Sequence, residues 1–211
     1  MRKRKPARTS SQPAAWKNFN AEAAYADSIF RSALGDQDGA VSALERALRA
    51  NSSYGPALLS MGSVEYQRGQ PSEGRNLFHS LISLPKNAPD LAELIDEAGS
   101  FLIQIRAYKD GLELYREAVR KFPRVAALHQ GLACCAGHES LYDEAVASSE
   151  RAVQLEPDNQ IFVNDLGWSL FEADRLEEAE RILQRAAAMD PSDELARENL
   201  CACRAELPHR G

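Results

Sequence analysis

Small and apolar residues recur along the chain at a nearly constant spacing. Segment 143–157 aligns without gaps with segment 177–191, which lies 34 residues later. Three series of mostly Gly, Ala and Ser residues advance by 34, 37, 34 and 34 residues, with Leu81 as the one larger member. A constant period of this length is typical of repeat architectures. The series are Ser28, Gly62, Gly99, Ala133 and Gly167, then Ala40, Gly74, Gly111, Ala145 and Ala179, and last Ala47, Leu81, Ala118, Ala152 and Ala186.

Each period predicts a pair of helices. The first small residue is expected midway along the first helix, and the second lies twelve residues later, near the start of the second helix. Small residues at both places let the two backbones approach closely. The third lies late in the second helix, where the next pair must pack. Pro123, Pro157 and Pro191 follow in phase and end that helix. The single 37-residue step places a three-residue insertion near Pro85 to Pro89.

The pattern resembles the tetratricopeptide repeat family. The residues that carry the resemblance are Ala98-Gly99, Leu102, Gly111, Tyr115, Ala118 and Pro123, and again Leu166-Gly167, Leu170, Ala179, Leu183, Ala186 and Pro191. The resemblance implies an all-α, right-handed superhelical solenoid of helix-turn-helix repeats. We expect residues 18–193 to hold five repeats, followed by a C-terminal capping helix over residues 194–207. The expected repeats span residues 21–54, 55–87, 92–125, 126–159 and 160–193.

Composition and cysteine usage fit this class of protein. Hydrophobic residues make up 44% of the chain, yet no apolar run approaches the ~20 residues of a membrane span. The basic start is not followed by an apolar segment, which argues against a secretory signal. The four cysteines read as small packing residues of a reducing compartment. We therefore expect a cytoplasmic protein.

We expect neither catalysis nor a bound cofactor or metal. The four histidines are scattered, and the sequence contains no HExxH, GxSxG, GxGxxG or phosphate-binding GxxxxGK motif. A metal site built from Cys134, Cys135 and His138 has suitable helical spacing but lacks a fourth ligand.

The resemblance implies that the first helix of each repeat lines a concave groove, which in the family usually holds an extended or helical peptide. Trp168 and Phe171 lie outside the packing positions, which favours contact with a partner; burial by the superhelix, the last helix or a dimer contact is the alternative. Acidic residues in the same groove suggest a partner carrying Lys or Arg, or simply a solvated helix face. The expected groove residues are Leu59, Tyr66, Glu93, Asp96, Glu97, Ile103, Gln130, Ile161, Asn164, Trp168 and Phe171.

These residues predict a non-catalytic protein–protein interaction module, an adaptor or assembly scaffold. Co-chaperone members of the family grip a C-terminal carboxylate with Lys and Asn. The equivalent positions here carry no basic residue, which argues against that specificity. These positions are Tyr25, Ile29, Leu59, Ser63, Asp96 and Ser100.

The N-terminal residues 1–17 suggest a different kind of function. Six of the 25 Lys and Arg residues lie there, with none of the 31 Asp and Glu residues. Such charge segregation is typical of a disordered arm. The alternative hypothesis is therefore tethering to nucleic acid or an anionic membrane through residues 2–8. Self-association is a further possibility. Trp16 and Phe19 are expected to cover the first helix pair.

Overall fold

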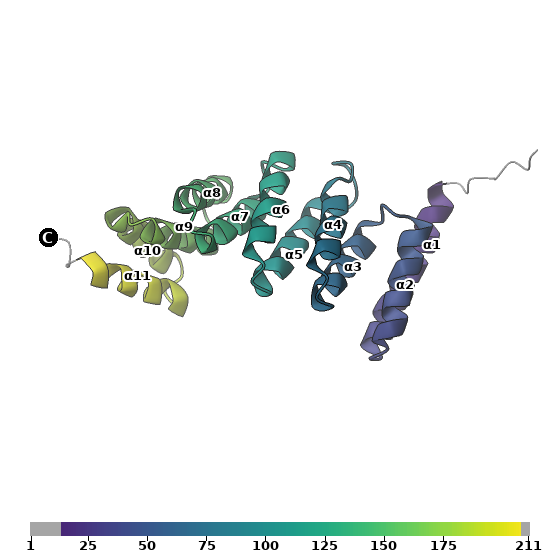
Figure 1. The fold of residues 1–211 in the computed structure, drawn as a ribbon. Helices are drawn as coiled ribbons and strands as arrows, with labels where there is room; N and C mark the ends of the chain where they lie inside the picture. The colour runs from purple at the N-terminus through teal and green to yellow at the C-terminus, as the bar shows by residue number, and fades with distance from the viewer. Residues whose placement is uncertain (1–13, 208–211) are drawn as a thin grey trace, which may run out of the picture. The chain divides into compact units, whose positions relative to one another are not determined.

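The computed structural model describes residues 14–207 of the chain, which form eleven α-helices and no strand within that range (Figure 1). The helices fall into two compact units, which divide between residues 81 and 82. Each unit is a stack of helical hairpins, as the sequence predicts. None of the helices in residues 14–207 is long and apolar enough to cross a membrane.

Unit 1 contains helices α1 (Ala14–Ala33), α2 (Gln37–Ala50), α3 (Gly55–Gln67) and most of α4 (Pro71–Ile82). The buried side chains of Leu44, Ala47 and Ala57 form its core, with Tyr25 and Tyr54 packed at the edge. The α3–α4 hairpin closes where the backbone of Gly62 lies directly against the ring of Phe78. The period of the small residues therefore sets where the helices touch.

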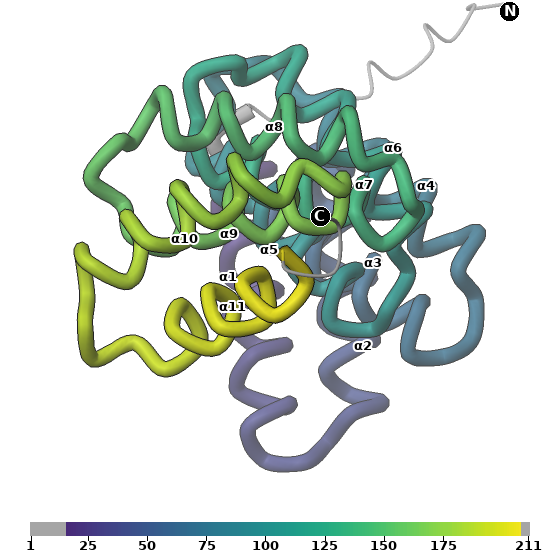
Figure 2. The backbone as a smooth tube through the Cα atoms, turned by 90° about the vertical axis from the view of Figure 1, so that its left-hand side faces the viewer, coloured from purple at the N-terminus to yellow at the C-terminus, as the bar shows by residue number. Residues whose placement is uncertain are grey.

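Unit 2 contains the remaining seven helices of the described chain. Figure 2 shows its last three helices, α9, α10 and α11, lying side by side. The bounds are α5 (Leu91–Gln104), α6 (Tyr108–Lys121), α7 (Ala126–His138), α8 (Tyr142–Leu155), α9 (Gln160–Glu172), α10 (Leu176–Met189) and α11 (Glu194–Glu206).

All fifteen positions of the three small-residue series are buried, which confirms their predicted role at helix contacts. A very close contact surrounds Tyr115 of α6, whose ring lies between Gly99 of α5 and Gly131 of α7. A Cβ atom would lie only 2.2 Å from the ring carbon Cζ at residue 99, and 2.1 Å from it at residue 131. Only glycine therefore allows α5 and α7 to enclose this ring.

The same turn joins the two helices of each hairpin. One residue of the turn has left-handed backbone geometry, with φ between 59° and 80°. In the second hairpin, Gly69 N–H donates to the Tyr66 carbonyl at 3.0 Å, and Gln70 N–H donates to the Glu65 carbonyl at 2.8 Å. These bonds satisfy carbonyls at the end of the first helix. The left-handed residues are Gly35, Gly69, Arg106, Ser140 and Asp174.

The structure corrects three expectations. Helix α1 begins at Ala14, so residues 14–17 are helical rather than part of an arm. Residues 1–13, including the basic residues 2–8, lie outside the described range. Trp16 and Phe19 are 59% and 61% exposed, so they do not bury themselves on the first hairpin. Cys201 is exposed and is therefore not one of the packing residues expected of the cysteines, whereas Cys203 is buried in a cluster with Leu183 of α10.

Candidate functional site

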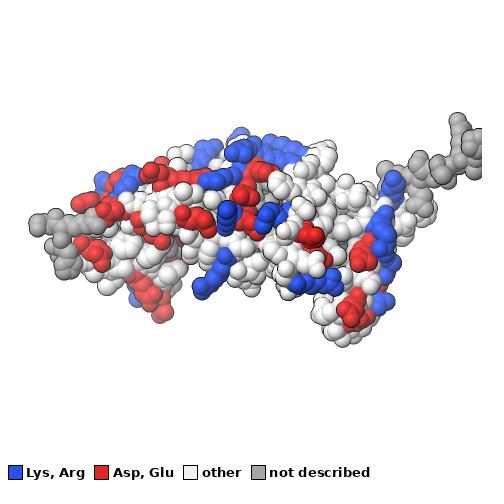
Figure 3. Space-filling model, viewed as in Figure 1, with Lys and Arg blue, Asp and Glu red and all other residues white. Residues whose placement is uncertain are grey.

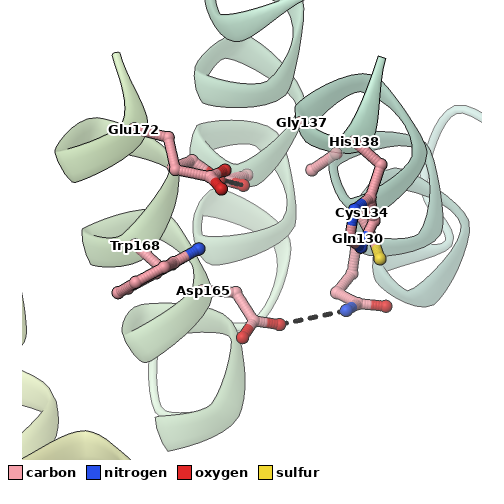
Figure 4. A pocket seen from close by; sticks show the side chains of 10 residues that line it. Gln130, Cys134, Gly137, His138, Asp165, Trp168 and Glu172 are labelled. Atoms are coloured by element: carbon pink, nitrogen blue, oxygen red, sulfur yellow. Dashed lines mark hydrogen bonds between the residues drawn. The ribbon is translucent and has the colours of Figure 1, made fainter. Parts of the chain in front are cut away.

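A pocket of about 140 Å³ opens between α7 and α9 in unit 2, and we call it the α7–α9 pocket (Figure 4). Residues four or seven apart on each helix share one face, so the helical period alone directs these side chains into the same space. Ser149 of α8 also lines the pocket. The lining residues are Gln130, Ala133, Cys134, Gly137, His138, Ser149, Asp165, Trp168, Ser169 and Glu172.

Two carboxylates of α9 flank the pocket. Asp165 is half-buried and accepts a hydrogen bond from the side-chain nitrogen Nε2 of Gln130 at 3.0 Å. Its burial raises the pKa of the Asp165 carboxyl above the usual range, although the hydrogen bond from Gln130 opposes this shift. Glu172 is exposed at the rim of the pocket. Its carboxylate oxygen Oε2 lies close to the backbone of Gly137, and a Cβ atom added at Gly137 would be 2.9 Å from this oxygen. The pocket therefore carries negative charge at both ends of one helix face.

Trp168 lies between these carboxylates along α9, and its indole is half-buried (Figure 4). The ring centroid is 5.0 Å from that of Phe171, with a tilt of 36° between the planes. Phe171 itself packs on the apolar cluster that includes Leu183 and Cys203. Phe171 thus packs against the indole, and Trp168 is the aromatic side chain that lines the pocket.

The rest of the pocket carries no carboxylate, and contacts within the protein hold several of its side chains in place. The hydroxyl oxygens of Ser149 and Ser169 are 2.9 Å apart and buried, so they satisfy each other at the floor. Burial raises the pKa of the Cys134 thiol, which favours the uncharged form. The His138 ring stacks on Tyr108, with centroids 3.8 Å apart. A hydrogen bond at the floor and a stacking contact at His138 therefore hold these parts of the pocket in place.

The negative charge of this pocket is a local feature. On the face drawn in Figure 3, Lys and Arg side chains are interspersed with Asp and Glu over unit 2. Between helices, for example, Arg116 of α6 donates to Glu144 of α8 at 2.9 and 2.5 Å. This ion pair thus joins two neighbouring hairpins.

The structure brings only part of the predicted groove together. Gln130 and Trp168 line the α7–α9 pocket as expected. Asn164 is 3% exposed and accepts a hydrogen bond from Asn199 of α11, because the last helix covers it. Tyr66 stacks on Phe78 inside the α3–α4 hairpin, with ring centroids 5.7 Å apart.

The other predicted residues lie outside the pocket. Asp96 is half-buried and accepts a hydrogen bond from the Tyr115 hydroxyl at 3.1 Å. The side chains of Glu93 and Glu97 are exposed on α5, and that of Ile161 is exposed on α9. Leu59 and Ile103 are half-buried, and Leu59 belongs to unit 1.

Sequence reasoning missed both carboxylates of the pocket. Asp165 and Glu172 are three residues before and four residues after Trp168, a spacing that places all three on one helix face. The signal was thus present in the sequence. It was missed because the assumed groove positions were one residue out of phase with these acids.

No cluster of three or more His, Cys, Asp or Glu side chains among residues 14–207 is arranged to hold a metal ion. The four cysteines are all free thiols. The pocket therefore offers hydrogen bonding, negative charge and an aromatic surface.

Comparisons with known proteins agree with this architecture. Residues 138–202 match the family model described as "Tetratricopeptide repeat". A curated relative is the small glutamine-rich tetratricopeptide repeat-containing protein 2 of Mycosarcoma maydis, 24% identical over 116 residues, which are 55% of this chain and 33% of that protein. The chain thus spans about a third of the length of this relative.

Two of the solved structures with a similar fold are described by the peptides they bind or their binding site. YrrB, described as a tetratricopeptide repeat protein with an unusual peptide-binding site, superposes with a TM-score of 0.61 at 18% identity, over 84% of this chain and 90% of YrrB. The first tetratricopeptide repeat domain of Spaghetti (RPAP3), bound to the HSP90 peptide SRMEEVD, gives 0.52 at 20% identity, over 56% of this chain and 93% of that domain. The family model covers residues 138–202, so the bounds of the five repeats stay predictions. The chain thus contains a segment that matches the tetratricopeptide repeat family, within a fold similar to that of solved tetratricopeptide repeat proteins.

Proposed function

We propose that this chain is a non-catalytic protein-interaction module that binds a basic peptide segment at the α7–α9 pocket. One Lys or Arg side chain of the partner would enter the pocket. The observation that carries this proposal is the position of the Trp168 indole between the carboxylates of Asp165 and Glu172, beside an open cavity of about 140 Å³. The fold supports the general activity, because tetratricopeptide repeats are protein–protein interaction modules.

The chemistry of the pocket suits a cation. A guanidinium or ammonium group over an indole face gains roughly 0.5–2 kcal/mol, more as water is excluded. Hydrogen bonds from such a group to a carboxylate are charge-assisted and therefore stronger than neutral ones. The cavity has room for several waters at about 30 Å³ each, which is enough for the end of a Lys or Arg side chain.

Further acidic groups lie within the same unit. Glu93 and Glu97 are exposed on α5, the helix that neighbours α7. They offer places for additional basic residues of the same segment, since opposite charges across an interface favour encounter and register. We propose the wider role of an adaptor or assembly scaffold in the cytoplasm.

The charge of the pocket separates this specificity from that of the compared peptide complex. The peptide bound to the Spaghetti domain, SRMEEVD, carries three acidic residues near its end. Asp165 and Glu172 would repel such a peptide, whereas they attract a basic one. We therefore infer that this pocket selects basic partners, whereas the compared domain binds an acidic peptide.

Two substitutions test the pocket directly. In titration calorimetry, we expect an apolar peptide with one central Arg to bind the wild type and to bind Asp165→Asn and Trp168→Ala about tenfold more weakly, because each substitution removes about 1.4 kcal/mol of contact with the cation. The control variant is Glu177→Gln, which removes an exposed carboxylate on α10 that does not line the pocket. The same peptide with Glu in place of Arg, and SRMEEVD, are the charge controls. Equal binding of the Arg and Glu peptides, or equal loss in the α10 control, would contradict the proposal.

The affinity for the Arg peptide should also depend on pH. Because burial raises the pKa of Asp165 above the ordinary 3.8, this carboxyl takes up a proton earlier on acidification than a free Asp would. Affinity should therefore be full at neutral pH and fall as the pH drops toward 4, while the charge on Arg stays constant. The Asp165→Asn variant, which lacks this titrating carboxyl, serves as the reference. A pH profile of equal steepness in that variant would exclude Asp165 as the titrating group.

A further inference from the structure

Helix α1 is apolar on two opposite faces. Its inner face packs on the rest of unit 1 through the buried side chains of Ala21 and Ser28, with Tyr25 beside them. Its outer face carries large apolar side chains that remain more than half exposed. They are Trp16 at 59%, Phe19 at 61%, Ile29 at 54%, Phe30 at 63% and, just after the helix, Leu34 at 69%. A surface helix normally has one apolar face, and a second one indicates a second partner.

The outer face follows the spacing of a coiled-coil seam. Exposed apolar residues recur at alternating steps of three and four residues, which is the spacing of the inward positions in a heptad repeat. Polar residues lie on the two flanks between the faces, for example Glu22 on one side and Asp27 on the other. The residues of this seam are Trp16, Phe19, Ala23, Ala26, Phe30 and Ala33.

We propose that this seam is a homodimer interface, formed by antiparallel packing of α1 against α1 of a second copy. The seam of one copy is complementary to the seam of a second copy that runs in the opposite direction. When Ala23 of one copy lies opposite Ala26 of the other, the two Phe residues face each other and Trp16 faces Ala33. Small residues at the centre allow close approach of the two helices, and each bulky residue meets a ring or a small side chain.

The exposed area matches what a dimer requires. A buried aromatic side chain covers about 150–250 Å². Three large exposed side chains lie in the seam, and those of Ile29 and Leu34 flank it. Together the five leave roughly 600 Å² of apolar surface per copy. A standard interface buries about 800 Å² per partner, of which about 65% is apolar in homodimers. A contiguous apolar patch of this size is at the upper limit for a monomer.

The N-terminal residues 1–13 do not fit as the occupant. Residues 1–13 are basic, and Met1 is their one large apolar side chain. Helix α11, by contrast, presents exposed charged residues such as Arg197 and Glu198. Helix α1 lacks such an outer face, which points to a partner with the same apolar seam.

Sedimentation equilibrium of the full chain tests the interface. We expect the wild type to dimerise at micromolar concentrations, and a Phe19→Asp/Phe30→Asp variant to raise the dimer dissociation constant at least about hundredfold, since it places charges inside the seam. Both side chains are exposed, so helicity by circular dichroism should be unchanged. The control is Leu195→Asp, because Leu195 is similarly exposed (57%) on α11. A monomeric wild type, or equal loss of dimer in the control, would overturn the proposal.

Disulfide trapping tests the orientation. In a Cys201→Ser background, which removes the one exposed native thiol among the described residues, Ala23→Cys protein is mixed with Ala26→Cys protein. The antiparallel seam predicts that the mixed dimer cross-links faster than either protein with itself, because residues 23 and 26 face each other. Faster self-cross-linking of Ala23→Cys would indicate parallel helices and would refute the antiparallel arrangement.

Discussion

Replacing Tyr115 by Ala is expected to lower the free energy of unfolding by about 3–5 kcal/mol, the usual cost of deleting a fully buried aromatic side chain. Tyr115 is 1% exposed, and three helices meet at its ring, because α6 carries it between Gly99 of α5 and Gly131 of α7. Neither glycine can fill the space that the ring leaves. Urea denaturation followed by helical circular dichroism would measure the loss as a lower transition midpoint.

Tyr115→Phe is the matched control for this prediction. It keeps the ring but removes the hydroxyl group that donates to Asp96 at 3.1 Å. We expect a cost of about 1 kcal/mol, typical of one hydrogen bond. If Tyr115→Ala were no more destabilising than Tyr115→Phe, the ring would not be the contact that joins the three helices.

The helix contacts could be predicted because they depend on side-chain volume. Gly167, for example, lies so close to Leu183 that a Cβ atom would be 2.6 Å from its side chain. Such contacts admit few residue types, so they leave a periodic trace in the sequence. The 37-residue step was equally informative, since residues 83–90 form a longer connection between α4 and α5 than those joining later hairpins, and the boundary between the two units falls beside it.

The turns within the hairpins left a weaker trace. Gly35 and Gly69 have the left-handed backbone that glycine adopts without strain. Arg106, Ser140 and Asp174 adopt the same conformation at the equivalent places. Hydrogen bonding at the helix end thus imposes the turn on residues that do not favour it. A sequence search for glycine finds only the first two.

The pocket could be predicted only in part, because it depends on the rotation of each helix about its axis. The predicted positions included Gln130 and Trp168, which line it, but also Asn164, which α11 covers. A rotation that moves Asn164 inward brings its neighbour Asp165 to the pocket. Volume restrictions fix the buried face of a helix, whereas the exposed face carries no comparable constraint on residue type. Its functional residues must therefore be located in three dimensions.

Gly131→Ala is expected to destabilise the protein by about 1–3 kcal/mol, the usual cost of overpacking a filled core. Alanine normally favours a helix by about 1 kcal/mol over glycine, so a net loss would isolate the clash with the Tyr115 ring, 2.1 Å from the new Cβ. Tyr115→Leu should relieve this clash. In the Tyr115→Leu variant, Gly131→Ala should therefore lower the free energy of unfolding by at least about 0.5 kcal/mol less than in the wild type. A double-mutant cycle of urea denaturation curves would measure this difference as the coupling energy. Additive effects would show that α7 shifts to accommodate the methyl group, and that the contact between glycine and ring does not fix the distance between α6 and α7.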